Sequence, residues 1–263
     1  MFYPFKLKAS VIDSLRNSSG NLSDDSQNES VAQARRKDQL RKYLFTTDGL
    51  INGKSLKELW FPQGEYHIFL SHSSQDVDKA RYLKRWFNHY CGLKCFIDAD
   101  VWENAYELLR ELDNKIKPVG ATNYNYEHRN QTTAHVYSML TMALFEAIDA
   151  IECPILIEST NSVTLTEGIK QGTLSPWIYE EVGFMGKLPH HIPERFSTRY
   201  FSVDTESVML NESVRDSVQM VHPLDITGFK QIVKEDMDAI RYKQVEKALD
   251  LLYRRRLLLR KRY

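Results

Sequence analysis

The feature that most constrains the fold is a short apolar run that leads into a polar turn and then an amphipathic helix. The run YHIFL covers residues 66–70, the length of a strand buried in a parallel sheet. It ends in SHSSQD, residues 71–76, which are turn and helix-capping residue types. Apolar residues then recur every three or four positions over 77–90, and Gly92 follows. With the strand LKCFID, residues 93–98, the pattern predicts a strand–helix–strand unit.

The alternation continues along the chain. We expect helices over 103–116 and 136–151, a third strand at 153–159, a helix that Ser175 caps and Pro176 opens, a fourth strand at 200–204, and helices from 229 to the end. The segments 120–133 and 161–174 are polar and are interpreted as loops. This order predicts an α/β domain with a central parallel sheet and helices on both faces.

The two ends of the chain lack this alternation. Residues 17–30 are almost entirely polar and predict a mobile loop, and a helix is expected over 31–45, followed by a linker. We therefore predict an N-terminal extension (1–63), an α/β domain (64–205) and a helical C-terminal extension with a basic tail (206–263).

In open parallel sheets, ligands bind at the carboxyl ends of the strands. This rule selects residues 71–76, 98–103 and 159–177 as candidate site segments. Trp177 and Glu181 lie four residues apart on a predicted helix and so share a face, whereas Glu180 points about 100° away. An indole beside a carboxylate could stack on a polar ligand and hydrogen-bond to it. The plainer alternative is a half-buried Trp beside a solvated Glu, and spacing alone favours that alternative.

Four further residues follow the first two strands. Ser71 and His72 come directly after the first strand, and Asp98 and Trp102 follow the second. Asp98 could accept hydrogen bonds from a sugar, and His72 could hold a phosphate or ribose. Each could equally serve a turn, a helix cap or an interface.

Several classes of protein lack support. Three cysteines do not form a disulfide framework, no zinc-ligand spacing occurs, and no Walker loop, GxGxxG or GxSxG is present. No signal peptide or transmembrane run is visible, so we expect a cytoplasmic protein without a metal site. The net charge of zero argues against a dedicated nucleic-acid binder.

The net charge of zero is the sum of two parts of the chain with opposite net charge. Six of the 35 basic residues lie in 254–263, which leaves 29 against 35 acidic residues, a net charge of −6, for the rest. We expect this tail to dock on the acidic body or on another copy, so that deleting it alters assembly more than the site.

Taken together, these motifs resemble a Toll/interleukin receptor (TIR) domain. EYHIFLSHSSQD, then CFIDADVW, resembles the start of that family, and ILIESTNSV, then SPWIYEEV, resembles its later S-x-W-x-x-x-E pattern. The resemblance covers about residues 64–204. It implies a flavodoxin-like sheet and, in many members, cleavage of NAD+ to nicotinamide and an ADP-ribose-type product. Such members commonly serve anti-phage defence, and some make cyclic or conjugated nucleotide signals for a separate effector.

The resemblance also implies site residues. The family's catalytic glutamate maps onto Glu181 and its aromatic neighbour onto Trp177, while Ser71, His72, and the segment from Asp98 to Trp102 line the substrate site and contact neighbouring subunits. NAD+ is then the substrate, and no cofactor or metal is needed. The long stretch after Trp102 departs from the family and leaves any assembly geometry open. The alternatives are a non-catalytic TIR adaptor that acts by assembly, and a nucleoside N-glycosidase or ribosyltransferase.

Overall fold

The computed structural model describes residues 1–19, 22, 34–35, 38–39, 42–43, 51–60, 64–97, 99, 105–116, 126–166, 169–196 and 220–256. The chain forms two compact units. The first consists of residues 1–22, 66–97 and 147–263, and the second of residues 23–65 and 98–146. The first unit contains the sheet.

The central sheet has five strands, all parallel, in the order β3-β2-β4-β1-β8. Its strands are β1 (Phe5–Lys8), β2 (Ile68–Ser71), β3 (Cys95–Ile97), β4 (Cys153–Glu158) and β8 (Lys230–Ile232). Every residue of β2 and β3 is buried, as a sheet covered on both faces requires. The predicted α/β class with a parallel central sheet is therefore confirmed.

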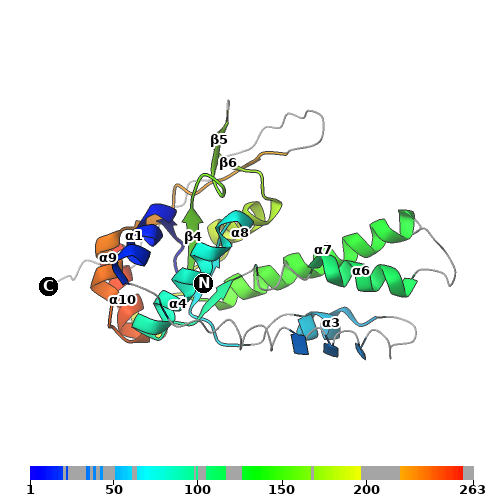
Figure 1. Cartoon of the computed structure of the whole chain (residues 1–263), viewed down its shortest axis with the longest axis horizontal. Helices are drawn as coiled ribbons and strands as arrows, with labels where there is room; N and C mark the ends of the chain where they lie inside the picture. The colour runs from blue at the N-terminus through cyan, green and yellow to red at the C-terminus, as the bar shows by residue number, and fades with distance from the viewer. Residues whose placement is uncertain are drawn as a thin grey trace. The chain divides into compact units, whose positions relative to one another are not determined.

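Helices flank this sheet (Figure 1). In the first unit they are α1 (Ala9–Ser19), α4 (Val77–Cys91), α8 (Pro176–Lys187), α9 (Lys234–Ile240) and α10 (Val245–Arg256), with short 3-10 turns η1 (Ser74–Asp76) and η2 (Glu194–Phe196). Helix α9 packs against both α1 and α10, α1 contacts β1, and α10 contacts β8. These contacts make α1, α9 and α10 one layer beside the β1–β8 end of the sheet.

The helix α4 confirms the prediction from apolar spacing. It starts after η1 and ends at Gly92, which has a φ of +66° and donates its N–H to the Asn88 carbonyl. Glycine adopts this left-handed conformation without the steric cost of a side chain. The buried residues of α4 include Leu83, Trp86 and Phe87, so one helix face supplies much of the core.

The two ends of the chain differ from the prediction. Residues 1–63 were expected outside the α/β domain, but β1 lies inside the sheet between β4 and β8, with Phe5 and Leu7 fully buried. Residues 206–263 were expected to be a helical extension, but β8 is the edge strand beside β1. Strand pairing is not local, so a four-residue strand can join a sheet whose other strands lie far along the chain.

Three smaller differences concern segments that were read as polar loops or linkers. Residues 17–19 belong to α1, and α3 (Gly53–Trp60) lies where a linker was expected. The polar stretch 161–174 forms an antiparallel hairpin of β5 (Thr164–Thr166) and β6 (Ile169–Thr173), which β7 (His222–Pro223) extends. The ring of His222 stacks on Tyr179 of α8 at 4.7 Å between centroids, which joins this small sheet to α8.

The second unit contains α3 and two longer helices. They are α6 (Ala105–Ile116) and α7 (Tyr126–Ala150), whose last four residues belong to the first unit. Helix α6 confirms the prediction for 103–116, whereas α7 starts ten residues before position 136 and includes most of the predicted loop 120–133. Arg129 of α7 pairs with the buried Asp113 of α6 at 3.4 Å. The predicted strand 200–204 lies outside the described residues.

The strand order defines where a ligand site is expected. From β2, the chain moves to β3 on one side, and β4 then pairs with the other side of β2. The order β3-β2-β4 matches the start of a flavodoxin-like sheet, and β1 from the N-terminus takes the next place. The change of direction lies between β2 and β4, so their carboxyl ends mark the expected crevice. Within the described part of the chain, no helix has the length and apolar character needed to cross a membrane.

Candidate functional site

The candidate site is built on the carboxyl ends of β2 and β4. These strands pair in parallel with Leu70 opposite Ile155 and Ser71 opposite Leu156. The residues that follow them, from His72 onward and from Ser159 onward, therefore emerge at the same edge of the sheet. Two of the three segments selected from the sequence, 71–76 and 159–177, lie in this one unit.

The central contact of the site joins Ser71 to Glu181. The Ser71 hydroxyl donates to Glu181 Oε2 at 2.5 Å, across 110 residues of chain, and both side chains have no exposed surface. A hydrogen bond to a carboxylate is among the stronger ones, and this one fixes the orientation of the acid. The two residues that the sequence analysis assigned to the end of the first strand and to the later helix are thus in direct contact.

The start of α8 positions Glu181 and Trp177. Ser175 accepts the N–H of Ile178 at 3.3 Å as the N-cap, and Pro176 occupies the first turn, as predicted. The buried Thr173 hydroxyl in turn accepts the Ser175 N–H at 3.1 Å, which ties the helix start to β6. Trp177 is half-buried one turn before Glu181 on the same helix face.

His72 is buried and has a structural contact. Its Nδ1 lies 3.0 Å from the Leu70 carbonyl oxygen at the end of β2, so this nitrogen carries the hydrogen in that contact. The contact holds the imidazole against its own strand. His72 therefore lies beside Ser71, but its position alone does not assign it a ligand.

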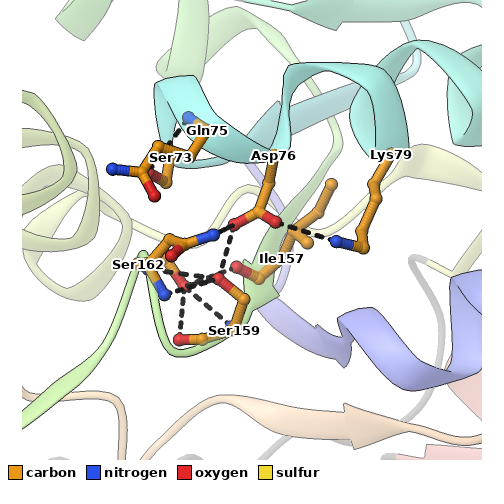
Figure 2. Close-up of polar contacts among 8 residues, drawn as sticks. Ser73, Gln75, Asp76, Lys79, Ile157, Ser159 and Ser162 are labelled. Carbon is orange, nitrogen blue, oxygen red and sulfur yellow. Dashed lines mark hydrogen bonds and ion pairs between the residues drawn. The ribbon is translucent and has the colours of Figure 1, made fainter.

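A second polar cluster lies at the same edge and is formed by Asp76, Lys79, Ser159 and Ser162 (Figure 2), together with Asn161. Asp76 is 1% exposed and accepts hydrogen bonds from Ser159 Oγ at 2.5 Å, from Asn161 Nδ2 at 3.3 Å and from Lys79 Nζ at 3.1 Å. Burial alone would raise the pKa of Asp76, but these hydrogen bonds and the Lys79 charge outweigh it and lower the pKa below its usual value. Asp76 is therefore a carboxylate at neutral pH.

Sequence reasoning selected the segment that contains Asp76 without giving this residue a role, and it missed Glu158. Asp76 was read as a turn residue, and only the fold brings Ser159 to it. Glu158 is the last residue of β4, two positions after Leu156, so it shares the sheet face of Ser71. Its Oε2 is buried and accepts no hydrogen bond from the described residues. A lone acid at the end of an apolar strand was the signal that could have identified Glu158.

Asp98 and Trp102 lie outside the described residues.

Comparisons with known proteins add no relative. A scan against family models, a search of curated proteins and a search of solved structures each found no significant match.

The three cysteines are not suited to nucleophilic chemistry. All are free and buried, and burial raises the pKa of Cys91 to about 12 and raises the pKa values of Cys95 and Cys153 as well. A thiol that stays protonated is a weak nucleophile and a poor metal ligand. Among the residues with described positions, no group of three or more His, Cys, Asp or Glu side chains converges as a metal site. The chemistry that this edge of the sheet offers is that of carboxylates and hydroxyls.

Proposed function

We propose that this protein is a TIR-type NAD+ nucleosidase of the cytoplasm, with Glu181 as its catalytic residue. The observation that carries the proposal is the buried hydrogen bond between Ser71 and Glu181 at the strand edge where α/β sheets bind ligands. It joins the two motifs on which the family resemblance depends.

The reaction requires little from the protein beyond charge and orientation. The bond between C1′ of the ribose and the nicotinamide nitrogen breaks, the electron pair goes to the nitrogen, and nicotinamide leaves as a neutral pyridine. Positive charge develops on the ribose, and water adds to C1′ with release of one proton. A carboxylate near the ribose stabilises that charge, as in glycosidases.

The residues around Glu181 have matching roles in this proposal. Ser71 orients the carboxylate, Trp177 supplies an aromatic surface for the nicotinamide or ribose, and Glu158 is available to ribose hydroxyls. If a hydroxyl of the adenosine ribose replaces water at C1′ and loses its proton, the product is an O-linked cyclic form of ADP-ribose, and such a product would serve a nucleotide signal in anti-phage defence. Self-association and a downstream effector belong to the same proposal.

The test is nicotinamide release from NAD+ by concentrated full-length protein, with the product identified by mass spectrometry. Glu181→Gln keeps an oxygen that accepts the Ser71 hydrogen bond but removes the negative charge. We expect it to lower the rate by about 100-fold or more, the usual effect of losing one electrostatic group. The matched control is Glu180→Gln, the same change about 100° around the helix, which should stay within about two-fold. Full activity of Glu181→Gln would contradict the proposal.

A non-catalytic TIR assembly module is the second candidate, and one observation favours it. Glu181 has no exposed surface and already accepts the Ser71 hydroxyl, which is also how a purely structural acid would be held. In that case Glu181→Gln changes the unfolding free energy, and the wild-type protein releases no nicotinamide. Competition between NAD+ and free nucleosides separates the proposed activity from that of a nucleoside N-glycosidase.

A further inference from the structure

Asp76, at the centre of the second polar cluster, does not use its side chain to cap the helix that it precedes. Asp76 occupies the N-cap position of α4, where an aspartate side chain normally accepts an N–H of its own helix, but its side chain makes no capping bond. Its carboxylate instead reaches the segment after β4 and accepts from Ser159 and Asn161 (Figure 2). The cap is instead supplied one turn earlier, where Ser73 Oγ accepts the Gln75 N–H at 3.4 Å at the start of η1, and the Asp76 carboxylate links the ends of two strands.

The Ser159 hydroxyl shows why the carboxylate is needed. Its oxygen accepts the N–H groups of Asn161 and Ser162, at 3.0 Å and 3.2 Å. A hydroxyl has a single hydrogen to donate, and at 2.5 Å Asp76 Oδ2 is its nearest acceptor. The same turn is closed by Ser162, whose hydroxyl donates to the Ile157 carbonyl at 2.8 Å and accepts the Ser159 N–H at 2.9 Å. The Ser159 hydroxyl also lies 3.4 Å from Ser162 Oγ, so Asp76 provides the shorter of its two described acceptor contacts and ties this turn to the start of α4.

The Asp76–Ser159 link lies at the same end of β2 as the Ser71–Glu181 contact. Asp76 lies five residues after Ser71, and Ser159 directly follows Glu158. The end of β2 is therefore held to two other elements, to α8 by the Ser71–Glu181 contact and to the turn after β4 by the Asp76–Ser159 contact. Reacting groups must be held to within about 0.5 Å, and a displacement near 1 Å can cost about 100-fold in rate.

We propose that Asp76 is a positioning residue, which holds the turn after β4 against the end of β2 and, through the β5–β6 hairpin that leads from this turn to α8, keeps Glu181 in register with Ser71. Asp76 does not itself touch substrate. Its effect on the rate of NAD+ cleavage rests on the proposed function, whereas its effect on the geometry does not.

The test compares the variants Asp76→Asn and Asp78→Asn with the wild-type protein. Amide hydrogen exchange and the kinetics of nicotinamide release are measured for each. Asp78 is exposed in the first turn of the same helix, so its variant removes the same charge without touching the cluster. In Asp76→Asn, an NH2 group faces the donors of Asn161 or Lys79. We expect exchange at residues 159–162 and 177–181 to accelerate by about ten-fold or more, with kcat reduced by about ten-fold or more and KM unchanged within about two-fold. Asp78→Asn should change neither.

A double-mutant cycle with Ser159→Ala strengthens the assignment. Because Asp76 and Ser159 share one hydrogen bond, the effects of the two substitutions on exchange should not add, whereas Thr160→Ala, an exposed neighbour, should add to Asp76→Asn. Asp76→Glu, which keeps the charge and both acceptor oxygens, should recover part of the kcat.

The outcomes separate the two proposals. Unchanged exchange in Asp76→Asn overturns the positioning role whatever the activity, and faster exchange with unchanged kcat overturns its catalytic consequence. An inactive wild-type protein, or a fully active Glu181→Gln, overturns the nucleosidase function, while the exchange data still decide the role of Asp76.

Discussion

At the scale of single residues, the site depends on carboxylates that are buried and held by hydroxyls. Glu181 accepts from Ser71, and Asp76 accepts from Ser159, each at 2.5 Å. A buried carboxylate without donors is costly, so these serines are part of what allows acids at the strand ends. For Asp76, these hydrogen bonds and the Lys79 charge also lower the pKa of the carboxyl group against the effect of burial.

Asp76 should contribute stability that depends on pH in a defined direction. Its pKa in the folded state lies below the usual value of 3.8, so its contribution is present above that value and is lost as the pH falls through the folded-state pKa. We expect Asp76→Asn to lower the free energy of unfolding by about 1–3 kcal/mol at pH 7. The difference from wild type should shrink below about pH 4 in denaturant titrations. A difference that stays constant down to pH 3 would contradict this, and Asp78→Asn provides the reference for a solvated aspartate.

At the scale of elements, the end of α10 is joined to α9 through a buried acid. Asp236 has no exposed surface and accepts from Arg255 Nε at 2.8 Å, from Arg256, and from the Val233 N–H at 2.9 Å. Asp236 therefore caps α9 and also forms ion pairs with two arginines in the last turn of α10. Two of the six basic residues of the tail thus pair with an acid of the neighbouring helix, while the expected docking of residues 254–263 on the acidic body or on another copy stays a prediction.

Removing both cations should destabilise the α9–α10 pair. Arg255→Gln with Arg256→Gln leaves the buried Asp236 without its charge partners, which should cost about 2–4 kcal/mol after allowing for the partial exposure of the arginines. Arg254→Gln, the exposed neighbour in the same helix turn, should change the unfolding free energy by less than about 0.5 kcal/mol. Adding Asp236→Asn to the double variant should recover part of the loss. Urea titrations of the wild-type protein and these three variants would show whether Asp236 depends on these arginines.

At the scale of the whole molecule, the N-terminal strand completes the fold. β1 pairs with β4 on one side and with β8 on the other, so it connects the site-bearing strands to the C-terminal elements. Its inward residues Phe5 and Leu7 have no exposed surface, while Lys8 is exposed. Residues 1–22 and 220–256 are thus parts of one unit with the strands that carry the site.

A substitution in β1 should therefore affect the whole first unit. Leu7→Ala creates a cavity in the centre of the sheet and should lower the unfolding free energy by about 2–5 kcal/mol, against less than about 0.5 kcal/mol for Lys8→Ala. Circular dichroism and Trp fluorescence should report one common shift of the unfolding midpoint, because β1 pairs directly with β4. A Leu7→Ala protein as stable as wild type would show that β1 is not a central strand.

Local signals in the sequence determined the elements that hold the site. Four local patterns were sufficient to predict β2, α4, β4 and α8, because each element is encoded within a few consecutive residues. The patterns are, in that order, the apolar run 66–70, the apolar spacing of 77–90 with Gly92, the apolar run 153–159, and the helix start at Ser175–Pro176. They also placed Ser71 at the end of a strand and Glu181 on the helix that starts at the end of the candidate segment 159–177. The α/β class followed from the order of these elements.

Only the tertiary structure decided which distant segments meet. FKLK, residues 5–8, is too short to identify a central strand, and its place between β4 and β8 depends on hydrogen bonds to residues more than 140 positions away. The same holds for Asp76, a plain turn residue in the sequence whose partner lies 83 positions further on. The spacing of apolar residues indicates which face of its own helix or strand a residue occupies. The order of the strands and the pairing of buried polar side chains depend instead on the packing of the whole unit.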